Sequence, residues 1–303
     1  MIFLKLLIIT ISLISLTNGQ ALLQGMNHPL DAQGWGLQAI STFSDKGTGS
    51  ALNPGITGVA DNYLKFNYTN FVLDINSTSI AFANAGKYGK YEISLSSLNY
   101  GQWDEKDEQG NKLGTYNVND LYGRLNWAGR ISGNLYGGVN LIYGFSQLYN
   151  YTANYLTGGL GLIYLMEPGF VIGLSTTNNV ITGKSYVKKE DLESLIVLGI
   201  SKKLAHLPMR VGIDAIRTSK DRYVANLGGL LDLNKVYLTW GISTKRDDQS
   251  TEDAVVNLLA GLSGGLGVNF DVYSLSVGYR NLGGMGSIVS LSFNWKFSEV
   301  KHD

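Results

Sequence analysis

Apolar and polar side chains alternate with a period of two along much of the chain. The clearest stretch runs from Ser287 to Phe297. Its apolar side chains are Val289, Leu291, Phe293, Trp295 and Phe297, and its polar ones are Ser290, Ser292, Asn294 and Lys296. Successive side chains of a β-strand point to opposite faces, so the pattern predicts a strand with one apolar and one polar face. Strands of this kind are typical of transmembrane β-barrels, although a β-sandwich gives the same alternation.

Thirteen further segments complete a series of fourteen predicted strands that begins at Tyr63. The fourteen segments, with the one already described as the last, lie near 63–70, 78–85, 90–101, 115–129, 134–147, 153–166, 169–180, 193–204, 208–217, 222–233, 235–243, 254–269, 272–281 and 287–297. In the fourth segment the apolar phase slips by one position after Val118. This slip predicts a β-bulge near Asn119 and Asp120.

The length of each connection depends on whether the predicted strand before it has an odd or an even number. Those after the even-numbered strands are short, whereas the three longest polar connections follow the third, seventh and eleventh strands, at 102–114, 181–192 and 244–253. Short turns at one rim and long loops at the other are typical of outer-membrane barrels with periplasmic termini. We therefore predict an all-β fold, a transmembrane antiparallel β-barrel of about 14 strands, with an N-terminal plug segment. The strand at 287–297 should close the barrel against the strand near Tyr63.

The N-terminal residues do not alternate and divide into two parts. Residues 1–20 combine Lys5 with an apolar stretch and small residues before the cleavage site, which predicts a secretory signal peptide. Cleavage after Gly19 or Ala21 fits equally well. The remaining chain, residues 21–303, forms a single predicted domain, made up of a plug segment (21–61), the barrel (62–297) and a tail (298–303).

The segment 21–61 is rich in Gly, Ser, Asn and Asp, with a turn at Asn53-Pro54-Gly55. It could be a disordered leader or a plug folded into the barrel lumen. Trp35, Leu37 and Phe43 favour the plug, because a disordered leader would not need apolar side chains to bury.

Composition narrows the function classes. The chain has no cysteine, which excludes disulfides and thiol chemistry, and its net charge of zero gives no electrostatic reason to expect nucleic acid as a partner. No stretch after the signal peptide is long and apolar enough for a transmembrane helix. Export together with alternating strands predicts the outer membrane of a Gram-negative-type bacterium, with its lipids as neighbours.

Three stretches resemble the PorV/PorQ family of outer-membrane proteins. The first runs from Gly36-Leu37-Gln38-Ala39 to Asn53-Pro54-Gly55. The second comprises Tyr100-Gly101, Asp104-Glu105, Asp107-Glu108, Gly110-Asn111, Gly114-Thr115-Tyr116 and Asp120. The third, from Gly199 to Pro208, is most similar to the PorQ branch.

The resemblance implies a FadL-like barrel of fourteen strands that takes part in type IX protein secretion and in attaching cargo to the cell surface. Secretion-system proteins or exported cargo would then be its partners. The alternative is a FadL-like channel for uptake of hydrophobic small molecules through the wall or the lumen. Both functions are non-enzymatic.

Candidate catalytic and metal-binding residues are few. The three histidines, His28, His206 and His302, fall in the plug, a short turn and the tail, so no Ser-His-Asp arrangement can be composed at one rim. They are also too scattered for a metal site, and we expect neither an enzyme nor a cofactor. The acidic run 104–108 could be a calcium loop, but its spacing does not match an EF-hand and favours a solvated hairpin.

The remaining candidates are charged residues of the lumen and of the long loops. The expected lumen-facing residues are Arg124, Arg210, Asp214, Asp232, Arg280 and Lys296. Charges in a lumen pair with one another or with a plug, or else they line a wet conduit. The candidate partner-binding loop residues are Lys184, Tyr186, Lys188, Lys189, Lys245 and Arg246. Loops on a rigid scaffold are where binding tends to be placed, although these residues could equally be only solvated.

Overall fold

The computed structural model describes residues 24–107, 109–166, 169–186, 192–245 and 259–297. Several predictions fall outside these residues: the signal peptide at 1–20, the tail at 298–303, and the loop residues Lys188, Lys189 and Arg246.

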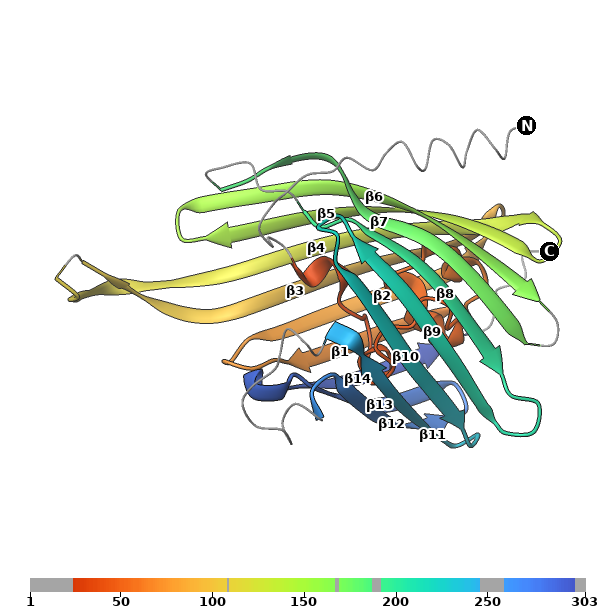
Figure 1. Ribbon diagram of the computed structural model, residues 1–303. Helices are drawn as coiled ribbons and strands as arrows, with labels where there is room; N and C mark the ends of the chain where they lie inside the picture. The colour runs from red at the N-terminus through yellow and green to blue at the C-terminus, as the bar shows by residue number, and fades with distance from the viewer. Residues whose placement is uncertain (1–23, 108, 167–168, 187–191, 246–258, 298–303) are drawn as a thin grey trace.

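The described chain forms a closed antiparallel barrel of fourteen strands, which confirms the predicted fold class (Figure 1). Each strand pairs with its sequence neighbours, and β1 pairs with β14, with Tyr63 opposite Lys296. The strands are β1 Tyr63–Asn70, β2 Asn76–Gly86, β3 Gly89–Lys106, β4 Lys112–Ser132, β5 Leu135–Leu148, β6 Tyr151–Met166, β7 Phe170–Lys184, β8 Leu195–Lys203, β9 Met209–Thr218, β10 Tyr223–Asp232, β11 Val236–Ser243, β12 Leu262–Phe270, β13 Tyr273–Asn281 and β14 Ser287–Lys296.

The barrel carries its apolar side chains on the outside. In β14, Leu291 is 51% exposed whereas Ser290 is 0% exposed, the reverse of a water-soluble protein. The other strands follow the same rule, with Leu95, Leu125 and Tyr279 outward. An apolar outer band around a polar interior suits a barrel surrounded by lipid. No helix within the described part of the chain is long and apolar enough to cross a membrane.

Strand pairing extends beyond the predicted limits at two of the long loops. Residues 102–106 and 112–114, predicted as loop, continue β3 and β4 into a hairpin that projects past the other connections (Figure 1). Residues 181–184 likewise belong to β7. Apolar and polar side chains alternate only weakly in these polar extensions, so the sequence pattern ends there. The backbone pairing between the strands continues. Of the strand predicted at 254–269, residues 254–258 lie outside the described residues, and β12 begins at Leu262.

The predicted bulge lies on the opposite strand. Asn99 pairs with Asn119 and Gln102 with Asn117, so the extra residue is in β3, at Tyr100-Gly101, and not at Asn119-Asp120. Gly101 has a φ of +83°, which glycine adopts without steric cost. β4 itself is regular at this point. Tyr116 and Val118 are apolar residues on the same face as the buried, polar Asp120, and in the sequence this looked like a slip of the alternation.

Residues 24–62, which we call the N-terminal segment, lie inside the barrel (Figure 1). Four short helical turns form most of it: η1 Gln24–Asn27, α2 Ala32–Gly36, η2 Asp45–Ala51 and η3 Pro54–Gly58. The side chains expected to be buried, Trp35, Leu37 and Phe43, are 3%, 0% and 0% exposed. Whether this segment closes the lumen to solutes, as a plug would, stays a prediction.

Hydrogen bonds join the N-terminal segment to strands all around the wall. Ala32 N donates to Ser292 Oγ of β14 at 2.6 Å, and Ser175 Oγ of β7 donates to Leu52 O at 2.7 Å. Two wall glycines make room for it. A Cβ on Gly278 would overlap the Ala32 carbonyl oxygen, and one on Gly138 would lie 2.6 Å from the Pro54 carbonyl. The glycines of the wall thus have a packing role.

The hairpin at the acidic run is held together by its own side chains. Asp104 pairs with Lys112 at 2.6 Å, and Asp107 accepts the Asn111 amide at 2.7 Å. These contacts are those of a solvated turn. The described residues hold no group of three His, Cys, Asp or Glu side chains placed to bind a metal ion.

Candidate functional site: an apolar chamber in the lumen

Three rows of inward side chains cross β3, β4 and β5 on the half of the wall nearer the long loops. The strand register sets them as Ser94–Arg124–Ile142, then Ser96–Tyr122–Gly144, then Leu98–Asp120–Ser146. Because inward residues recur every second position, each row lies about 7 Å from the next along the strands. Along β4 the inward side chain therefore changes from cationic Arg124 to aromatic Tyr122 to anionic Asp120 toward the long-loop rim.

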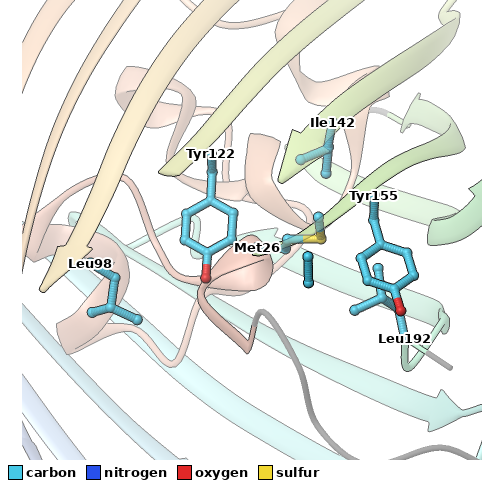
Figure 2. Close-up of a cluster of buried hydrophobic side chains, with 7 residues drawn as sticks. Met26, Leu98, Tyr122, Ile142, Tyr155 and Leu192 are labelled. Carbon is cyan, nitrogen blue, oxygen red and sulfur yellow. The ribbon is translucent and has the colours of Figure 1, made fainter. Parts of the chain in front are cut away.

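The middle of this wall faces a packed cluster of apolar side chains, which we call the chamber (Figure 2). Its members are Met26, Leu98, Tyr122, Ile142, Ala153, Tyr155 and Leu192. The wall strands β3 to β6 supply five of them, whereas Met26 comes from η1 and Leu192 from the β7–β8 connection. None is more than 6% exposed. Apolar side chains that converge inside a barrel are the environment that an apolar small molecule requires.

Asp120 marks the outer end of the chamber. This side chain is 2% exposed and accepts hydrogen bonds from three hydroxyl groups: Tyr100 at 2.8 Å, Tyr122 at 2.7 Å, and Ser146. Hydroxyl donors satisfy both carboxyl oxygens, which lowers the cost of burying the group. The Ser146 hydroxyl also contacts Tyr186, a predicted partner-binding residue of the β7–β8 connection.

Arg124 marks the inner end of the chamber. Its guanidinium is 6% exposed and donates through Nη2 to the carbonyl oxygen of Met26. Neither Nε nor Nη1 has a hydrogen-bond partner among the described residues. Beside it lies a cavity of about 10 Å³, lined by Ser94, Ser96 and His28 among others. A cavity of this size has room for about one water molecule.

Below the chamber, a buried ion pair fastens the N-terminal segment to the wall. Lys65 Nζ of β1 lies 2.6 Å from Asp31 Oδ2, with the two side chains 1% and 7% exposed. Asp31 also caps α2, accepting the Gly34 amide at 2.6 Å. Next to it, the Tyr63 hydroxyl donates to Glu92, whose other oxygen accepts Asn126 Nδ2 at 3.1 Å.

His28 is held among aromatic rings of this segment and the first loop. Its ring lies 5.3 Å from that of Trp35 and 5.1 Å from that of Phe71. Burial, followed by the positive charges of Arg280 and Lys245, lowers the pKa of His28 to about 4. The imidazole is therefore neutral at physiological pH.

The predicted lumen-facing residues separate into two groups. Arg124, Arg210 and Asp214 contact the N-terminal segment, with Asp214 accepting both the amide and the hydroxyl of Ser41, at 2.7 and 2.9 Å. Arg210 lies within 3.5 Å of Ser44 Oγ. Arg280 is partly buried in β13, and its Nε has no hydrogen-bond partner among the described residues.

Asp232 and Lys296 lie instead at the short-turn rim. They line a cavity of about 450 Å³ whose other charged members include Lys46, Asp61 and Lys235. Lys296 pairs with Asp61 at 2.9 Å. This cavity is polar and open, unlike the chamber at the other side of the N-terminal segment.

The loop and turn candidates lie far from one another. Lys184 ends β7 and Lys245 follows β11, and both are exposed on the long-loop side. The turn at Asn53, Pro54 and Gly55 lies inside the barrel instead. Asn53 Oδ1 accepts the Gly55 amide at 2.9 Å and Nδ2 donates to Leu162 O at 3.2 Å.

Three important lumen residues were missing from the predicted set: Lys65, Glu92 and Asp120. Each falls on the polar side of a predicted strand, so the alternation alone could have found them. Their partners could not have been found, because Asp31, Tyr63 and Ser146 lie 26 to 34 positions away.

Comparisons with solved structures find barrels of the same fold. The toluene transporter TodX of Pseudomonas putida aligns with a TM-score of 0.60 and 12% identity, over 89% of this chain and 100% of TodX. The Ralstonia pickettii toluene transporter TbuX aligns with a TM-score of 0.56 and 12% identity, over 88% of this chain and 98% of TbuX. A Pseudomonas aeruginosa FadL homologue aligns with a TM-score of 0.52 and 10% identity, over 92% of this chain and 100% of the homologue.

No family model and no curated protein matches the sequence. The structural neighbours are transporters and channels, not enzymes. Nothing in the comparisons supports the PorV/PorQ resemblance specifically. What they establish is the architecture: the chain folds as a closed fourteen-strand barrel similar to those of TodX and the FadL homologue.

Proposed function

We propose that the protein is an outer-membrane channel for hydrophobic small molecules and that the chamber is part of the route. The chamber carries this proposal. It joins buried apolar side chains of the wall, of η1 and of the β7–β8 connection on the half of the barrel nearer the long loops, and a water-filled pore would have no use for them.

The fold supports the same function. Three barrels that align over nearly their whole length are described as two toluene transporters and a FadL homologue. Their identity to this chain is low, so the likeness concerns the backbone and not the residues that bind. The side chains of the chamber supply that part of the argument.

An uptake experiment tests the proposal. Ala153 is fully buried in the chamber, so the larger side chain of Ala153→Phe should crowd the chamber and block the route. Cells that express the wild-type protein should accumulate labelled toluene faster than cells without it, and the variant should lose most of that gain. Val139→Phe, on the lipid-facing side of β5, is the matched control and should retain uptake. Equal uptake with and without the protein would refute the proposal.

The PorV/PorQ reading, with a role in type IX secretion, rests on the sequence resemblance alone. Deleting the gene and following surface-attached cargo tests it. A loss of attached cargo with unchanged toluene uptake would favour secretion over the channel.

A further inference from the structure

Arg124 is a buried cation whose hydrogen-bonding capacity is only partly used. A guanidinium has five N–H groups, and among the described residues the one acceptor of Arg124 is the carbonyl oxygen of Met26. Nε and Nη1 have no hydrogen-bond partner, and no carboxylate of the described residues lies within ion-pair distance. The negative charge of Glu92 on β3 acts on Arg124, but the carboxylate oxygens of Glu92 accept hydrogen bonds from Tyr63 and Asn126. Buried donors of this kind call for an acceptor.

Met26 occupies the place that a ligand would take. Its carbonyl oxygen accepts from the Arg124 guanidinium, and its side chain, 1% exposed, fills the centre of the chamber between Tyr122 and Tyr155 (Figure 2). The residue thus presents an oxygen acceptor joined to a short, flexible apolar group. It belongs to η1 of the N-terminal segment and not to the wall, so it can be displaced without breaking a strand.

We propose that the chamber binds small carboxylates with a short apolar body, such as monoaromatic acids, in place of Met26. The carboxylate lies on Arg124, where a guanidinium can offer two parallel N–H bonds, and the apolar body lies against Tyr122, Ile142 and Tyr155. Ser94, which faces Arg124 across the β3–β4 pair, borders the same cavity. This inference rests on the proposed channel function and names the ligand class.

The wall also limits ligand length. Asp120 and Arg124 face the same side of β4 and lie four residues apart, about 13 Å along the strand. Asp120 and its three hydroxyl donors make the outer end polar, so a long alkyl tail would meet buried polar groups there. A ring with a short substituent fits between the two ends, and a long-chain fatty acid does not.

Binding of matched probes to the detergent-solubilised protein tests the proposal. The probes are 4-ethylbenzoate and 4-ethylbenzamide, which share shape but differ in charge. In the wild-type protein the benzoate should bind roughly tenfold more tightly, since hydrogen bonds to charged groups exceed neutral ones by this order. Arg124→Gln should abolish the difference. Arg210→Gln, the control at another lumen-facing arginine, should keep it, and Met26→Ala should tighten binding of both probes.

Several outcomes would overturn the inference. Equal affinity of the two probes in the wild-type protein would do so, as would a benzoate preference that survives Arg124→Gln in a variant with normal heat-modifiable gel migration. Palmitate binding as tightly as 4-ethylbenzoate would refute the length limit. Toluene uptake without any benzoate preference would leave the channel standing and remove this inference. A benzoate preference that depends on Arg124, without toluene uptake, would remove the proposed channel function and leave this inference standing.

Discussion

Replacing Lys65 with methionine should destabilise the folded protein by about 3–5 kcal/mol, because the buried carboxylate of Asp31 loses its one ion-pair partner among the described residues. In the wild-type protein Lys65 Nζ and Asp31 Oδ2 are 2.6 Å apart, and both side chains are almost fully buried. Lys65 Nζ also lies 4.3 Å above the ring centroid of Tyr63. Methionine retains most of the apolar length of lysine, so the change removes mainly the charge.

A double-mutant cycle separates the ion pair from other effects of the substitution. Asp31→Asn keeps a good N-cap residue for α2 but leaves Lys65 uncompensated. The double variant with Lys65→Met leaves neither charge, so its stability should be closer to that of the wild-type protein than is the stability of Lys65→Met alone.

Guanidinium unfolding of the protein in lipid vesicles, followed by tryptophan fluorescence, measures these differences. Lys296→Met is the control, because the Lys296–Asp61 pair has side chains 56% and 49% exposed. An exposed pair contributes about 0–1 kcal/mol. The reasoning fails if Lys65→Met costs no more than Lys296→Met, or if the double variant shows the sum of the single losses.

Three further predictions concern the N-terminal segment. Deleting residues 24–61 should raise conductance in planar bilayers, and an unchanged closed barrel would refute the plug. Because burial lowers the pKa of His28 to about 4 from 6.5, the unfolded chain takes up this proton first as the pH falls. The free energy of unfolding should therefore fall as the pH drops from about 6.5 to about 4, and this loss should level off below pH 4. A His28→Asn variant, measured by pH-dependent unfolding, should lack this loss. Gly278→Ala should push the backbone at Ala32 off the wall and weaken hydrogen-exchange protection there. Gly123→Ala, where the nearest atom to the added Cβ is Leu95 Cδ2 at 3.7 Å, should leave protection at Ala32 unchanged.

The strands could be predicted because alternation is a local property. In β14 the side chains of Val289 and Ser290 must face opposite ways whatever the rest of the chain does, and lipid outside selects the apolar face. The alternation of short and long connections along the chain then located the two rims. Prediction failed where alternation is weak, as in the polar hairpin 102–114, and where two strands share an irregularity, as at Tyr100-Gly101.

The sequence by itself determined that this chain alternates, closes and turns its apolar faces outward. Only the tertiary structure decided what fills the interior. Ala32 meets Ser292 across 260 positions and Ser41 meets Asp214 across 173, and no local pattern encodes such pairings. The chamber has the same origin: Met26 reaches Arg124 across 98 positions. Strand direction follows from neighbouring residues, whereas a site in the lumen follows from which distant segments the closed barrel brings together.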